Sequence, residues 1–220
     1  VVVFENVQGI LLGNAIEYVK EIYKQMNEAG YILQHWLLNA RNMGVPHNRP
    51  RVFFLGLRND LAEPFMVQKD FFTRVPYINM EFSEREIPLC EYADYKGRQI
   101  PKGVMKYWKH RTEKDASIGD IVKREENRLS MFNNMMLRKD KVCNTISAME
   151  DRLLYYDYPR YMSVHDTLLA SSFPLDYDFD GMKPWFACGM CVPPVMMANV
   201  ASRIWDYWLS KIGKGGSNDY

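Results

Sequence analysis

The sequence predicts an α/β fold from three observations in its first 60 residues. The chain opens with a continuous β-branched run, a segment of helical periodicity follows, and two further apolar runs come after a glycine. Strand, helix, strand and strand in this order are typical of an α/β sheet. A length of 220 residues with 47% hydrophobic content suits one large domain or two small ones.

Each element of this first part has a local signature. The opening "VVVF" has no polar position, which predicts a fully buried, parallel strand. Apolar residues recur at helical spacing over residues 14–29, and Gly30 stands where a helix C-cap belongs. Residues 31–40 and 51–58 are typical of strands, with a turn-forming stretch between them.

Residues 60–140 have a different character. They are less periodic, contain four prolines and are rich in Lys, Arg, Tyr and Trp, which indicates a second domain of short strands and loops. Ser117 is a candidate N-cap for a helix over 117–129. Residues 143–157 then predict a pair of strands that returns to the core.

Two helix signals mark the C-terminal part. Ser163 is followed three positions later by Asp166, which approximates a capping box. Residues 193–213 predict an amphipathic helix that begins at prolines and is closed by Gly213. Residues 213–220 have the composition of a frayed tail.

The charge is uneven along the chain. Residues 96–141 carry 13 basic and 6 acidic side chains, although the whole chain has a net charge of only +1. A basic middle part predicts a module that meets a polyanion, and a merely solvated Lys/Arg face is an equal alternative. No stretch approaches 18 uninterrupted apolar residues, so we expect no membrane span and a cytoplasmic protein.

The four cysteines are few and dispersed, which fits a reducing compartment. Cys188 and Cys191 form a C-x-x-C, but no second pair of Cys or His stands at ligand spacing, so we predict no metal site. A redox pair and a packed turn are both open, and the packed turn is favoured.

Three local patterns carry chemistry. Glu5-Asn6-Val7 follows the first strand, where ligand-facing side chains of α/β sheets stand. Arg49 and Arg51 alternate before a buried strand, which is costly unless a polar or anionic group receives the guanidinium. Residues 188–194 lead into the last helix. Singly, each pattern is weak, because a strand-end glutamate is more often a structural acid.

In this order and spacing, the patterns resemble the back half of the DNA cytosine-5 methyltransferases. The matching segments are Glu5–Val7, 44–51, the variable stretch 60–140, 159–179 and 189–194. The resemblance covers nearly the whole chain. It implies part of a Rossmann-like methyltransferase catalytic domain together with a smaller, irregular, strand-rich target-recognition domain.

The resemblance implies candidate catalytic residues. In this family the target cytosine is flipped out of the duplex, a cysteine attacks its C6, and its C5 takes a methyl group from S-adenosylmethionine. By motif position, Glu5 is expected to hydrogen-bond the ring N3 and the exocyclic amine. Arg51 is expected to reach O2 or a phosphate, and Arg49 to brace the loop.

The resemblance also implies that the chain is incomplete. The family's glycine-rich cofactor loop and its nucleophile loop precede the glutamate motif, so we assign no nucleophile here and expect the 220 residues alone to be inactive. Met190, Cys191 and Val192 of the final motif are the candidate cofactor-binding residues, in an incomplete S-adenosylmethionine site. The expected partner is the missing N-terminal half or a complementary subunit.

Four positions depart from the family pattern. His47 replaces a glutamine and Met190 an asparagine, while His165 and Asp166 replace an arginine and a glutamate. These differences indicate a divergent member of the family.

The basic middle part supports a double-stranded DNA partner. Basic and aromatic residues alternate over 95–111, which predicts phosphate contacts. Tyr107 and Trp108 are equally expected as residues of a small core. The candidate DNA-binding residues are Lys102, Lys106, Lys109 and Arg111.

The resemblance divides the chain into functional parts. Residues 1–60 and 183–212 are assigned to the catalytic domain, 61–182 to the target-recognition domain and 213–220 to a tail. Three alternatives remain: a non-catalytic DNA-binding or regulatory relative, an RNA cytosine-5 methyltransferase of the same architecture, and an unrelated α/β domain with chance matches.

Overall fold

The computed structural model describes residues 1–130 and 134–212, and the chain forms two compact units. Unit 1 contains residues 1–39, 50–82 and the described residues from 197 onward. Unit 2 contains residues 40–49 and 83–196.

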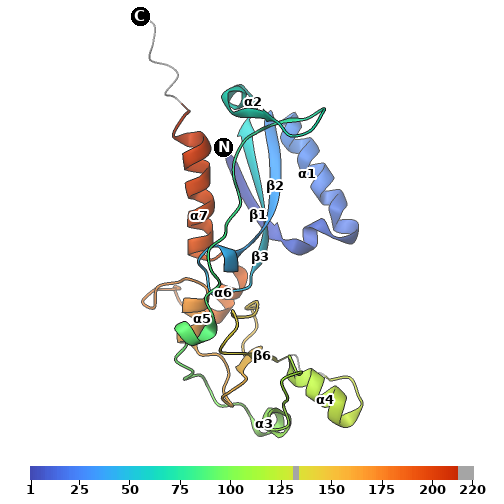
Figure 1. Ribbon diagram of the computed structural model, residues 1–220, viewed down its shortest axis with the longest axis vertical. Coiled ribbons are helices and arrows are strands. Elements are labelled where there is room, and N and C mark those ends of the chain that lie inside the picture. The colour runs from blue at the N-terminus through green and yellow to red at the C-terminus, as the bar shows by residue number, and fades with distance from the viewer. Residues whose placement is uncertain (131–133, 213–220) are drawn as a thin grey trace, which may run out of the picture. The chain divides into compact units, whose positions relative to one another are not determined.

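Unit 1 is built on a three-stranded sheet in the order β1-β3-β2. Its strands are β1 (Val2–Val7), β2 (Tyr31–Asn39) and β3 (Pro50–Arg58), and β3 is antiparallel to both neighbours. Helix α1 (Ile16–Glu28) lies alongside the sheet (Figure 1). The strands predicted at 31–40 and 51–58 and the helix predicted within 14–29 are confirmed.

The prediction for the first strand is wrong in two respects. β1 pairs antiparallel with β3, and the four predicted residues are not fully buried, because Val1 is exposed and Val2 to Phe4 are half-buried. The reason is the strand order, because β3 returns between β1 and β2 and separates the two strands that run in the same direction. Among the described residues, β1 is therefore an edge strand.

One core lies between the sheet and α1. It contains Val19, Leu33, Val52 and Phe54. Gly30 has φ +80° and ends α1 in the left-handed region, as expected for a C-cap glycine.

Most of the last helix, from residue 197 onward, belongs to unit 1. Helix α7 (Pro194–Ile204) continues into a π-helical turn (Trp205–Leu209), and the Trp208 Nε1 donates to the Tyr77 carbonyl at 2.8 Å. The predicted helix is confirmed to this point, and Gly213 lies outside the described residues. The stretch Pro184–Leu209 meets the length and hydropathy expected of a membrane-spanning helix. This is weak evidence, because a core helix can meet the same two criteria. The remaining elements of unit 1 are α2 (Asn59–Ala62), β4 (Met66–Gln68) and β5 (Arg74–Pro76).

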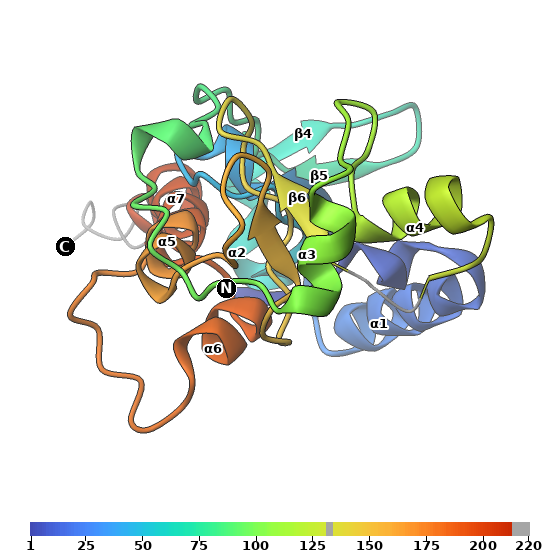
Figure 2. The same cartoon turned by 90° about the horizontal axis from the view of Figure 1, so that it is seen from below.

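Unit 2 is organised around a short parallel pair of strands, β6 (Met135–Leu137) and β7 (Leu153–Tyr155). Met136 and Leu154 face a core that includes Tyr107 and Trp108, so those two aromatic residues are core residues. Helix α3 lies next to β6 at this core (Figure 2). The helices of unit 2 are α3 (Lys102–Trp108), α4 (Ile118–Glu126), α5 (Val164–Ala170) and α6 (Pro184–Met190).

The predicted strand pair within 143–157 is wrong. Only Leu153–Tyr155 is a strand, and its partner is β6. The backbone before it has other hydrogen-bond partners than a strand. The Cys143 carbonyl accepts from the Asn48 N–H, and the Ile146 N–H donates to His47 Nε2.

Two helix starts follow the predicted chemistry. Ser117 caps α4, and Asp120 reciprocates in a complete capping box. Ser163 accepts from the Asp166 N–H at the start of α5, but the Asp166 carboxylate accepts from other donors, so only half of the predicted box forms.

Ser117→Ala is expected to lower the free energy of unfolding by about 1 kcal/mol, because the Asp120 N–H loses its acceptor. Urea denaturation followed by circular dichroism measures the change. Ser83→Ala, at an exposed position outside every helix and strand, is the control. Equal stability of the two variants would contradict the capping role.

Candidate functional site

Glu5 and Arg51 lie close together in the unit 1 sheet. The register pairs Glu5 with Phe53 and Val7 with Arg51, so Glu5 and Arg51 are diagonal neighbours on one face. The Arg51 Nε lies 3.5 Å from the Glu5 Oε2, and the Arg51 Nη1 donates to the Pro50 carbonyl at 2.9 Å.

This pair combines a covered cation with a more accessible anion. The Arg51 side chain is 10% exposed and the Glu5 side chain 32%. A carboxylate acceptor and a guanidinium donor therefore stand side by side at the end of β1. Such a pair can bind the edge of a planar heterocycle that carries both an amino group and a carbonyl oxygen.

Arg49 has a different environment, in unit 2. It is fully buried, and its guanidinium donates to three backbone carbonyls: Ile146 at 3.1 Å, Gly189 at 2.7 Å, and Cys191 at 3.0 and 2.7 Å. These contacts join three segments far apart in the sequence. They suit a bracing role rather than direct contact with a substrate.

The segments around Arg49 approach each other closely. A Cβ added at Gly189 would lie 2.4 Å from the backbone of Ser147 and Ala148, so only glycine fits there. His47 is also fully buried, and its Nε2 accepts from the Ile146 N–H at 2.8 Å. We call Arg49, His47 and Gly189 with their partners the Arg49 junction.

The three candidate cofactor-binding residues follow this junction. Met190 ends α6 and is 64% exposed, while Cys191 and Val192 are half-buried. Met190 and Cys191 line a hollow of about 460 Å³. The other side chains around it are mainly aromatic and acidic: Phe173, Tyr177, Asp178, Phe179, Asp180 and Phe186, with Met182 and Ala187.

Three candidate DNA-binding lysines lie on one side of α3. Lys102, Lys106 and Lys109 are spaced by four and three residues, which places exposed ammonium groups along one helical stripe. Lys106 forms an ion pair with Glu126 at 3.1 Å. Lys102 and Lys109 form no ion pair with the described residues, and so they are the better candidates for phosphate contacts.

Arg111 is placed differently from the lysines. Its guanidinium carbon lies 3.5 Å from the centre of the Trp108 ring, and its Nε donates to the Tyr156 carbonyl at 2.6 Å. This stacked, hydrogen-bonded position indicates a structural contribution to unit 2.

A buried network around Asp166 was not recognised from the sequence. The Asp166 carboxylate accepts from the N–H groups of Asp94 and Tyr95, from the Tyr155 hydroxyl at 2.6 Å and from His165 Nδ1 at 2.8 Å. Burial, with the Asp166 carboxylate beside it, raises the pKa of Tyr155.

The same residues also resemble a metal-binding cluster. Asp94, His165 and Asp166 offer ligand atoms within 4.8 Å of one another, but the Asp166 oxygens already have donors. The sequence signal was the histidine and aspartate at two positions of the arginine-rich motif.

The two buried cysteines lack the character of nucleophiles. Burial raises the pKa of the Cys143 thiol to about 12 and that of Cys188 to about 11, so both thiols are protonated at neutral pH. The Cys191 thiol donates to the Cys188 carbonyl at 3.5 Å, as in a packed turn.

Comparison with known proteins gives a consistent result. The family described as C-5 cytosine-specific DNA methylase matches residues 1–206. The type II methyltransferase M.DdeI of Desulfomicrobium norvegicum is 26% identical over 92% of this chain and 62% of its own length. M.FnuDI of Fusobacterium nucleatum is 49% identical over 26% of this chain and 17% of its own length. The chain thus spans less than two thirds of these relatives.

Solved structures show the same fold. The Dnmt2 methyltransferase of S. pombe superposes with a TM-score of 0.57 at 13% identity, over 93% of this chain and 65% of its own. A DNMT2 mutant of Spodoptera frugiperda gives a TM-score of 0.60 at 14% identity, over 92% and 66%. At these identities the likeness concerns the fold alone.

Proposed function

Because the chain belongs to the C-5 cytosine-specific DNA methylase family, we propose that it is the C-terminal part of a DNA (cytosine-5-)-methyltransferase. The reaction transfers a methyl group from S-adenosylmethionine to C5 of a cytosine flipped out of duplex DNA. The observation that supports this proposal best is the diagonal pair of Glu5 and Arg51, 3.5 Å apart on one face of the sheet.

In the proposed complex, the two side chains hold the cytosine by its polar edge. The Glu5 carboxyl hydrogen-bonds ring N3 and the exocyclic amine, and the Arg51 guanidinium donates to O2 or to an adjacent phosphate. Held in this way, the ring keeps one orientation throughout the reaction, which lowers the entropic part of the barrier. Arg49 acts through the backbone that it braces and is a positioning residue.

S-adenosylmethionine supplies an electrophilic methyl group when it is bound. The hollow beside Met190 and Cys191 fits part of this cofactor, because aromatic rings and the carboxylates of Asp178 and Asp180 suit a flat or cationic group. No cationic side chain lines that hollow among the described residues. We therefore assign the partner of the cofactor carboxylate to a group outside this hollow.

The proposal extends to the organisation of the protein. Residues 1–60 and 183–212 serve the catalytic domain, and residues 61–182 serve recognition of double-stranded DNA. The nucleophile and main cofactor loops come from an N-terminal half or a complementary subunit, so that this chain alone is inactive. The bacterial and phage sources of the relatives support a cytoplasmic location.

Methyl transfer by the complete protein tests this function. The protein that carries this chain is incubated with labelled S-adenosylmethionine and either duplex DNA or RNA, and the nucleosides are analysed for 5-methylcytosine. Label in DNA is the expected result. If only RNA is labelled, the protein is an RNA methyltransferase. If the protein binds DNA and labels neither nucleic acid, it is a non-catalytic relative.

Lys109→Ala is expected to weaken binding to all duplexes by a similar factor and to reduce the slope of log K against log salt by about 0.9, because one phosphate contact is lost. Fluorescence anisotropy over a salt series measures this slope. Lys24→Ala, on the exposed side of α1, is the control. An unchanged slope for Lys109→Ala would place the DNA-binding surface elsewhere.

A further inference from the structure

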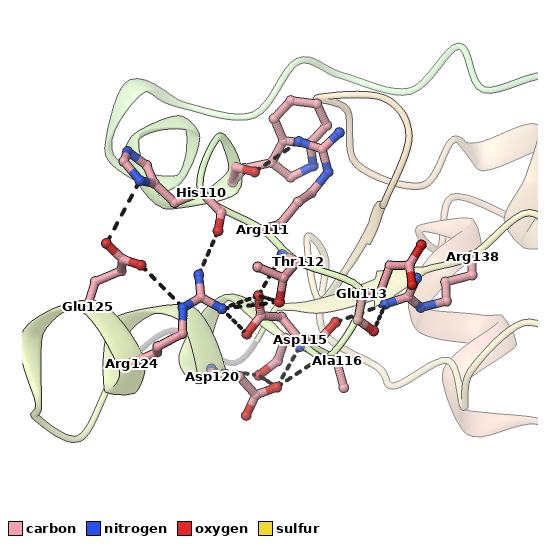
Figure 3. A network of polar contacts seen from close by, with 12 residues as sticks. His110, Arg111, Thr112, Glu113, Asp115, Ala116, Asp120, Arg124, Glu125 and Arg138 are labelled. Carbon is pink, nitrogen blue, oxygen red and sulfur yellow. Dashed lines mark hydrogen bonds and ion pairs between the residues drawn. The ribbon is translucent and has the colours of Figure 1, made fainter.

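The loop between α3 and α4 in unit 2 is polar, exposed and yet extensively anchored. We call residues 110–116 the tip loop (Figure 3). Apart from Ala116, its residues are polar or charged, and only Asp115 is buried. A surface loop of this kind is ordinarily mobile, because it contributes few apolar contacts.

The first anchor is the buried carboxylate of Asp115. Its side chain is 6% exposed and accepts from the N–H and the hydroxyl of Thr112 at 2.7 and 2.8 Å. Arg124 of α4 binds both oxygens of Asp115 and also donates to the His110 carbonyl at 2.6 Å. Burial by itself would raise the pKa of Asp115, but the hydrogen bonds from Arg124 and Thr112 hold it below its ordinary value. The loop therefore closes on a charged, fully paired carboxylate.

Arg138 fixes the loop backbone, and Arg111 anchors the start of the loop to the rest of unit 2. The Arg138 Nη2 donates to the carbonyls of Glu113 at 2.6 Å and Asp115 at 3.3 Å, and its guanidinium lies 4.2 Å from the centre of the Tyr156 ring. Arg111 stacks on Trp108 at the start of the loop. Figure 3 shows the guanidinium groups of Arg124 and Arg138 directed at the loop from two other segments of unit 2.

The anchored backbone exposes two charged side chains. Glu113 and Lys114 are both exposed, and neither forms an ion pair with a residue in the described ranges. Three guanidinium groups thus hold a loop that buries little surface of its own. A loop that already has its bound conformation loses less entropy on association. The ordering of this loop therefore favours binding of a partner.

A charged hollow adjoins this tip. It measures about 500 Å³, and its charged lining residues are of both signs: Glu113, Asp140 and Asp157 with Arg138, Lys139 and Lys141. Both lysines are exposed, on the segment that follows β6. A base-reading side chain needs phosphate contacts nearby to set its register, and these lysines can supply them.

We propose that Glu113 and Lys114 read base edges in the major groove of the DNA, while Lys139 and Lys141 hold adjacent phosphates. A carboxylate accepts from N4 of cytosine, and an ammonium group donates to O6 and N7 of guanine, so the two together suit a C·G-containing step. This inference rests on the proposed function, since it names the residues with which the same protein selects its methylation site.

The test measures sequence preference with the complete protein. A library of randomised duplexes is methylated and sequenced, and binding to the same library is selected in parallel. Glu113→Gln is expected to shift the preference at one position from cytosine toward adenine, because glutamine pairs with N6 and N7 of adenine. Lys114→Ala is expected to lower the preference for guanine at a neighbouring position by roughly tenfold or more.

Matched variants separate reading from general binding. Lys139→Ala is expected to weaken binding to all sequences equally, and the exposed controls Glu150→Gln and Lys123→Ala are expected to leave the preference unchanged. Thermal denaturation of each variant checks that its fold is intact.

The outcomes are distinguishable. If wild-type protein methylates DNA and both tip variants keep its sequence preference, the base-reading role is overturned and the proposed function stands. If wild-type protein methylates no duplex, the proposed function itself is overturned, and the inference that rests on it fails with it.

Discussion

Arg51→Ala is expected to reduce methyl transfer by the complete enzyme by at least about 100-fold, because the guanidinium that orients the flipped base is lost. The loss concerns kcat/KM rather than folding. Glu5 keeps about a third of its side chain in solvent, so the ion pair with Arg51 contributes at most about 1 kcal/mol to stability.

Single-turnover methylation of a duplex substrate, with a melting curve for each variant, measures both quantities. Arg58→Ala is the matched control, because Arg58 lies on the same strand but forms an exposed pair with Asp60. Arg51→Lys is expected to recover only part of the activity, since an ammonium group lacks the planar fork. Near-normal methylation by Arg51→Ala would reject the proposed role.

Arg49→Ala is expected to lower the free energy of unfolding by about 3–5 kcal/mol, because buried carbonyls of Ile146, Gly189 and Cys191 lose their donor together. For a chain of this size that loss corresponds to a decrease in Tm of roughly 10 °C. Arg49 and Arg51 are two residues apart in the sequence, but their alanine variants should differ in what they lose. Arg49→Ala should lose folding stability, whereas Arg51→Ala should lose methyl transfer.

Urea and thermal denaturation measure the change. Arg85→Ala removes an arginine from an exposed pair with Glu91 and should cost less than about 1 kcal/mol. Arg49→Lys should be intermediate, because lysine can satisfy only some of the three carbonyls. A cost for Arg49→Ala as small as that of the control would show that the Arg49 junction does not stabilise the fold.

The pair of Glu5 and Arg51 illustrates how far the sequence could lead to the site. Strand periodicity places Glu5 on the same side as Val3 and Val7, and Arg51 on the same side as Phe53. It does not say which strands are neighbours or in which register. The antiparallel pairing of β1 with β3 supplies both, and it brings the two side chains together.

For the candidate DNA-binding residues, the sequence could not separate an exposed side chain from a structural one. Lys109 and Arg111 look alike in the sequence, but Arg111 stacks on Trp108 while Lys109 stays in solvent. The tip loop has no sequence signature either, because Asp115, Arg124 and Arg138 are ordinary charged residues until the fold places them together.

The sequence by itself determined the features that depend on residues a few positions apart. These are the helix over 16–28 with its terminal Gly30, the buried strand 50–58 and the N-cap at Ser117, where hydrogen bonds and side-chain faces are local. Only the tertiary structure decided the edge position of β1, the partner of β7 and the burial of Arg49. Those depend on backbone groups up to about 140 residues apart, which find one another only when the chain has folded.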